Sequence, residues 1–155
     1  MSRLTRSVHI DAAAADVWAA MMDLEQWPRW ASQFKSLERL GGGGLALNSR
    51  VRVSPKGMPA SVWQVTDYED GRSFTWESRL GPGVRVTGGH VLTPTGKGTT
   101  AQFWLDADGP LGSLLGPVLR RLVFSRNTRA ATEGLKRHVE QQSPSTPPAD
   151  AGAAI

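Results

Sequence analysis

The side chains best suited to proton transfer are Ser78 and His90, which stand on two consecutive segments with strand-like alternation. Alternate residues of a strand point to the same face, so Ser78 shares a face with Trp76, and His90 shares one with Val86 and Gly88. Both polar side chains are therefore predicted to point inward, where His90 could act as a general acid or base. A core histidine held by a neighbouring hydrogen bond is the alternative interpretation.

Arg126 is the second polar residue in an apolar setting, because it falls within the helical stripe formed by Leu119 and Leu122. A buried guanidinium needs a partner, which could be an acidic ligand group, Asp23 or Glu25. Alternatively, the stem of Arg126 covers apolar surface while its head reaches solvent.

Other kinds of chemistry lack the residues they require. The chain has no cysteine and only three histidines, which are far apart in sequence, so no metal site and no cofactor are expected. No nucleophile elbow surrounds Ser78, which argues against a hydrolytic triad. The glycine run at 41–44 lacks the lysine and hydroxyl residue of a phosphate loop.

The charge distribution restricts the possible partners. The net charge is +4, but the arginines are scattered along the chain, whereas a nucleic-acid surface gathers them on one face. No apolar run is long enough to span a bilayer, and the first residues lack a secretory apolar region. We therefore expect a cytoplasmic protein without a nucleic-acid partner and with no indication of membrane contact.

Apolar periodicity predicts an α+β domain over residues 1–142. Asp11 is the expected N-cap of the first helix. The Pro/Ala-rich residues 143–155 are expected to be a disordered tail. Six or seven twisted antiparallel strands should curl, and a helix laid into them should leave a cavity. The expected strands are 4–10, 34–40, 45–53, 60–68, 73–80, 84–92 and 99–107, and the expected helices are 13–22, 24–30 and 111–141.

Several short stretches in this order resemble the polyketide cyclase/dehydrase and lipid-transport superfamily, also called SRPBCC or START-like. The resemblance covers about residues 3–141 and implies a helix-grip fold. In that fold, a curved antiparallel sheet wraps around a long C-terminal helix, with two short helices after the first strand. The stretches are Val8-His9-Ile10-Asp11-Ala12, Asp16-Val17-Trp18, Trp27-Pro28-Arg29-Trp30, Gly98-Thr99-Thr100 and Gly134-Leu135-Lys136.

The resemblance and the inward faces together predict a ligand cavity of several hundred Å³ between the sheet and the long helix. In families of this shape, the segment that holds Trp30 borders the cavity mouth, whereas Trp27 could simply plug the end of the sheet. The expected ligand-binding residues are Trp30, Val51, Trp76, Ser78, Val86, Gly88, His90, Phe103, Leu119, Leu122, Val123 and Arg126.

Three functions fit these features. The first is a protein that binds a small hydrophobic molecule such as a lipid, a quinone or a polyketide-like compound. The second is a cyclase, aromatase or dehydratase that uses His90 as its acid or base. The third is a stress or interaction module without a physiological ligand. The sequence favours binding, because it supplies one obvious general base on a mostly apolar face.

Deletion of residues 143–155 should leave the melting temperature within about two degrees, because this segment has no apolar face to bury. Thermal unfolding followed by circular dichroism measures this. A fall of about ten degrees or more would show that the segment docks on the domain.

Overall fold

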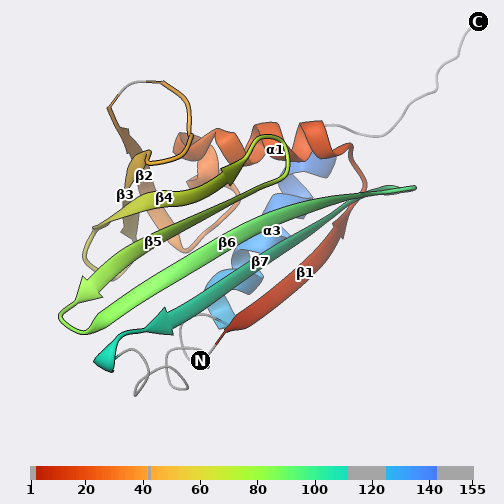
Figure 1. Cartoon of the computed structure of the whole chain (residues 1–155). Helices are drawn as coiled ribbons and strands as arrows, with labels where there is room; N and C mark the ends of the chain where they lie inside the picture. The colour runs from red at the N-terminus through yellow and green to blue at the C-terminus, as the bar shows by residue number, and fades with distance from the viewer. Residues whose placement is uncertain (1–2, 42, 112–124, 143–155) are drawn as a thin grey trace, which may run out of the picture.

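The computed structural model describes residues 3–41, 43–111 and 125–142. These residues form seven strands, two short N-terminal helical segments and a C-terminal helix (Figure 1). The elements in chain order are β1 (Leu4–Ile10), α1 (Ala14–Met22), the 3-10 helix η1 (Leu24–Arg29), β2 (Phe34–Leu40), β3 (Arg50–Pro55), β4 (Ser61–Glu69), β5 (Ser73–Gly81), β6 (Val84–Thr95), β7 (Gly98–Asp108) and α3 (Ser125–Gln142).

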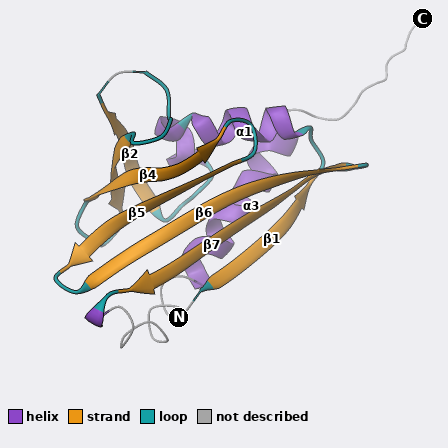
Figure 2. Ribbon diagram, in the orientation of Figure 1, coloured by secondary structure: helices purple, strands orange, loops and turns teal. Residues whose placement is uncertain are grey.

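The strands form one curled antiparallel sheet in the order β1-β7-β6-β5-β4-β3-β2. Strands β2 to β7 follow one another as hairpins, and β1 closes the far edge beside β7. Helix α3 crosses one face of the sheet and packs against β1 and β7, as Figure 2 shows. This is the predicted helix-grip architecture, and its concave face is the one that α3 covers.

Alternation along the strands separates the two faces of the sheet. Phe74, Trp76 and Ser78 of β5 are buried, and so are Val86 and His90 of β6, as the sequence pattern predicts. Because directly paired residues of antiparallel strands point to the same face, these side chains form continuous rows across the concave surface.

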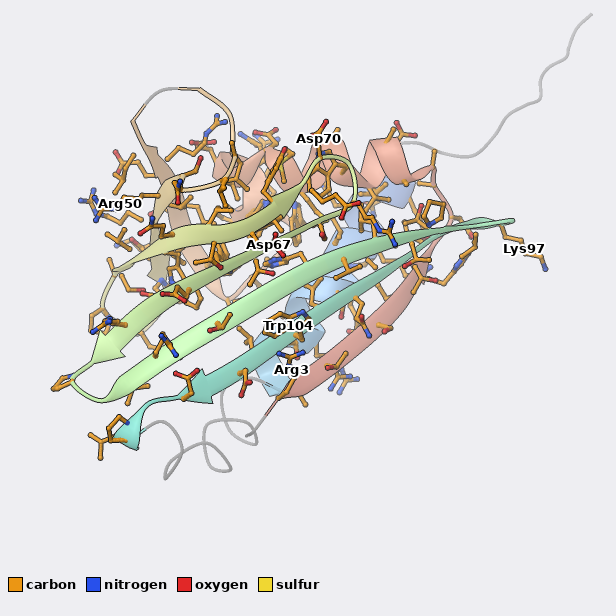
Figure 3. All side chains as sticks on the ribbon, viewed as in Figure 1. Arg3, Arg50, Asp67, Asp70, Lys97 and Trp104 are labelled. Carbon is orange, nitrogen blue, oxygen red and sulfur yellow. The ribbon has the colours of Figure 1, made fainter. Side chains whose placement is uncertain are left out.

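The opposite face of the sheet carries Trp104, whose side chain lies with Arg3 on the side away from α3 (Figure 3). The Arg3 guanidinium lies 3.9 Å from the centre of the Trp104 ring. A side chain on Gly89 would overlap this indole, so glycine is required beneath it. Trp104 therefore points away from the concave face, in alternation with its buried neighbour Phe103.

Helix α3 approaches the rest of the molecule closely because Gly134 has no side chain. A Cβ atom placed on Gly134 would overlap the carbonyl oxygen of Trp30. Leu135 and Val139 of the same helix are fully buried, and each contributes roughly 1.5–3 kcal/mol through burial of apolar surface. Lys136 Nζ fixes the helix to β1 through a 2.8 Å hydrogen bond to the carbonyl oxygen of His9.

Two local predictions are wrong. Asp11 is not the N-cap of α1. The cap is Ala13, without a side-chain hydrogen bond, and the amide of Asp11 donates to Glu140 Oε2 at 2.8 Å. The strand expected over 45–53 begins only at residue 50, because Asn48 adopts a left-handed conformation with φ of 70° and turns the chain. The Ser49 hydroxyl stabilises this turn by accepting a hydrogen bond from the amide of Ala46.

Part of the predicted organisation lies outside the described residues. This is true of the helix expected over 112–124, with its Leu119, Leu122 and Val123, and of the segment 143–155. Among the helices that the structure describes, none is both long and apolar enough to cross a membrane.

Candidate functional site

His90 lies at the centre of an aromatic cluster on the concave face. Its ring stacks on Phe74 with a centroid distance of 4.3 Å and an interplanar angle of 16°. Phe103 meets it edge to face at 4.7 Å, and Trp76 does so at 5.6 Å. Trp27, from the 3-10 helix, completes the cluster at 5.7 Å. Rings from η1, β5 and β7 therefore converge on one imidazole of β6.

This burial determines the charge of His90. Removal from water lowers the pKa of the imidazole to about 3, although a hydrogen bond with the backbone of Phe74 acts in the opposite direction. The ring is therefore neutral at physiological pH. Its Nδ1 atom is buried and has no hydrogen-bond partner among the described residues. A neutral imidazole offers one donor and one acceptor nitrogen.

An apolar hollow with a volume of about 130 Å³ lies beside this cluster. It is smaller than the several hundred Å³ expected. Its lining is contributed by η1, β2 to β7, α3 and the connections after η1 and β3. The described lining residues are Trp27, Gln33, Phe34, Val53, Pro55, Met58, Pro59, Ser61, Trp63, Trp76, Val86, His90, Phe103, Trp104, Leu105 and Thr128. Trp104 borders the pocket although its indole lies on the other face of the sheet, against Gly89 and Arg3.

The predicted ligand-binding residues divide into three groups. Trp76, Val86, His90 and Phe103 line the pocket. Trp30, Val51, Ser78 and Gly88 are buried on the same side of the sheet but outside the pocket lining. Leu119, Leu122 and Val123 lie outside the described residues, as does the side chain of Arg126, whose backbone belongs to α3.

Ser78 and Gly88 have structural partners. The Ser78 hydroxyl donates a 2.8 Å hydrogen bond to the carbonyl oxygen of Val62, on the neighbouring strand β4. A Cβ atom on Gly88 would lie 3.0 Å from Trp76 Nε1, so this glycine makes room for the indole. In the described structure, no hydrogen bond joins Ser78 to His90, and the two do not form a proton-transfer pair.

Trp27 lines the pocket, and Trp30 lies behind it with the ring centres 5.2 Å apart. The Trp27 indole is held by a 3.0 Å hydrogen bond from its Nε1 to the carbonyl oxygen of Met21. The sequence analysis favoured Trp30 as the cavity residue, and the structure reverses this choice. The 3-10 helix around Pro28 turns Trp27 toward the pocket and leaves Trp30, its C-cap, behind it.

Sequence reasoning also missed the rim of the pocket. The turn between β3 and β4 contributes Met58 and Pro59, and Met58 is 47% exposed. Trp63 follows on β4, with its Nε1 bonded to the Ser61 hydroxyl at 3.0 Å. In the sequence, the signal for the rim was Met58, a methionine that lies between Pro55 and Pro59. The signal for Trp63 was the inward residue Val65, because strand residues two positions apart point to the same face.

With this geometry established, comparison with protein families gives a clear result. Residues 1–140 match the model of the family described as polyketide cyclase / dehydrase and lipid transport. This chain belongs to that family. The resemblance noted in the sequence is thereby confirmed. No curated protein matches the sequence.

Solved structures share the fold at low identity. A START superfamily protein from Mycobacterium smegmatis has 17% identity and a TM-score of 0.71, over 90% of this chain and 98% of that chain. The di-domain ARO/CYC protein StfQ from the steffimycin biosynthetic pathway has 16% identity and a TM-score of 0.73, over 92% of this chain and 52% of that chain.

A third similar structure is a Thalictrum norcoclaurine synthase point mutant in complex with a transition state analogue. It has 15% identity and a TM-score of 0.68, over 91% of this chain and 95% of that chain. At such identities these neighbours confirm the helix-grip fold and carry no information about the ligand of this chain.

The buried imidazole predicts a pH dependence of stability. The unfolded chain binds a proton at His90 below about pH 6.5, whereas the folded chain binds it only near pH 3, so stability falls as the pH falls between these values. Between pH 7.5 and pH 5 the loss from this group should be about 2 kcal/mol. Urea unfolding at the two pH values measures it.

The matched control is His90→Phe, which keeps an aromatic ring in the cluster and leaves every other titratable group in place. The drop in unfolding free energy between the two pH values should be about 2 kcal/mol smaller in this variant. Equal drops in both proteins would show that His90 titrates near its ordinary pKa.

Proposed function

We propose that this chain binds a small, predominantly apolar molecule in the pocket beside His90 and does not convert it. The observation that carries the proposal is the pocket itself, which is walled by aromatic and aliphatic side chains and bordered by an exposed methionine. Apolar hollows with a few polar groups are the usual form of small-molecule sites. Membership of a family of cyclases, dehydrases and lipid carriers supports the same function.

Catalysis by His90 is the competing function, and the geometry argues against it. A general base works best when its pKa lies near the working pH, whereas burial lowers the pKa of His90 to about 3. Ser78 is the inward polar neighbour suggested by the sequence, but its hydroxyl donates its hydrogen bond to the carbonyl oxygen of Val62. A ligand that meets His90 therefore finds a fixed neutral hydrogen-bonding group rather than an acid-base pair.

A module without a ligand is the third possibility, and the open volume argues against it. Domains of this size pack their interiors with few voids larger than a water molecule. Here, aromatic side chains that include Trp27, Trp63 and Trp76 surround a hollow of about 130 Å³ instead of filling it. Location in the cytoplasm remains part of the proposal.

Filling the pocket tests the proposal. Val86 lines the hollow and is 1% exposed, so Val86→Phe places a ring in the space that the ligand would occupy. The affinity for 4-fluorotoluene, followed by broadening of its ¹⁹F NMR signal, should fall at least about tenfold, which corresponds to about 1.4 kcal/mol.

Val91→Phe is the matched control, because Val91 lies on the same strand and alternates to the other face of the sheet. It should bind the probe like the natural chain. Equal weakening in both variants, or no weakening in either, would show that the probe does not occupy this pocket. Failure of the natural chain to bind any apolar probe would contradict the proposed function itself.

A further inference from the structure

The described lining of the pocket is uncharged, which restricts the charge of any ligand that it can bind. None of its described lining residues is an aspartate, glutamate, lysine or arginine. The polar lining residues are Gln33, Ser61, His90 and Thr128, all of which are neutral at physiological pH. An ionised group placed in such surroundings loses its hydration without gaining an opposite charge.

His90 reinforces this restriction. Its ring sits among Phe74, Trp76, Phe103 and Trp27, and these rings offer no charge that would stabilise an imidazolium. The N–H of the neutral imidazole is used on the backbone of Phe74, so the unpartnered Nδ1 can accept a hydrogen bond from a ligand hydroxyl. It cannot act as a counter-ion for a carboxylate. The burial that lowers the pKa of His90 to about 3 acts in the same direction.

The dimensions and shape of the pocket restrict the ligand further. An apolar cavity of about 150 Å³ accommodates benzene, and this pocket measures about 130 Å³. Its walls are ring faces and edges from Trp63 and Trp76, whose centroids lie 5.4 Å apart, and from Trp27. Such walls favour a flat ligand, because aromatic pairs gain about 0.5–1.5 kcal/mol beyond burial of their area.

We infer that the bound molecule presents to this pocket an uncharged aromatic ring, about the size of one substituted benzene, with a hydroxyl that donates a hydrogen bond to Nδ1 of His90. This inference rests on the proposed function and narrows the ligand to neutral phenol-like compounds. It excludes fatty acids and other carboxylates as the group held beside His90.

Among the side chains that the structure describes, Arg6 is the cation that could oppose this assignment. It stands opposite Phe103 in the pairing of β1 with β7, and it is half-buried on the concave face. Its Nε atom is buried without a hydrogen-bond partner among the described residues. Arg6 is nevertheless not among the residues that line the pocket, so we assign it no contact with the ligand.

Three probes of the same ring size test the inference by ¹⁹F NMR at pH 7.5: 4-fluorophenol, 4-fluorotoluene and 4-fluorobenzoate. The phenol should bind most tightly and the benzoate at least about tenfold more weakly than the phenol, because its charge is not compensated. In His90→Phe the advantage of the phenol over the toluene should disappear, whereas in His9→Phe, an exposed histidine of β1, it should persist.

The possible outcomes distinguish failure of the inference about the ligand from failure of the proposed binding function. If 4-fluorobenzoate binds more tightly than the phenol, or if octanoate displaces bound 4-fluorophenol at a lower concentration than unlabelled phenol does, and Arg6→Gln abolishes that binding, the ligand is an anion. The inference is then wrong while the binding function stands. An advantage of the phenol that survives in His90→Phe removes His90 from the assignment. If no probe and no fatty acid binds, the proposed function fails together with the inference.

Discussion

The structure depends on the burial of one imidazole among aromatic rings. Strand pairing places Phe74, His90 and Phe103 side by side on three neighbouring strands, so that one row of the sheet is aromatic from β5 to β7. Trp27 reaches the same row from η1, outside the sheet. The loss of hydration at His90 is a cost that the surrounding packing must offset, and it fixes the ring as a neutral group.

Close backbone approach makes this arrangement possible. Gly88 leaves room for the Trp76 indole, and Gly134 lets α3 lie against the backbone of Trp30. Helix α3 then closes one side of the concave face and contributes Thr128 to the pocket. Because protein interiors tolerate little overlap, a methyl group at either glycine would move an element that shapes the pocket.

The sequence predicted the parts of the site that follow from strand periodicity. A period of two determines which face Trp76, Val86, His90 and Phe103 occupy, and all four line the pocket. The antiparallel sheet, the C-terminal helix and the family were also predicted, because each depends on patterns that are local in the sequence.

The remainder depends on features that local patterns do not encode. The choice between Trp27 and Trp30 is made by the orientation of a short 3-10 helix around Pro28. The alternation over 45–53 continues past the point where Asn48 turns the chain, so the strand was predicted too long. Met58 and Pro59 reach the pocket from a turn, and the spacing of turn residues carries no information about which cavity they border.

The most direct test of this account is the position of a bound neutral ring. Intermolecular nuclear Overhauser effects can be recorded between 4-fluorophenol and the full chain with its aromatic and methyl groups assigned. The account predicts cross-peaks from the ring protons of the probe to Trp76, Val86 and His90. Cross-peaks confined to Trp104 and Arg3, on the opposite face of the sheet, would contradict it.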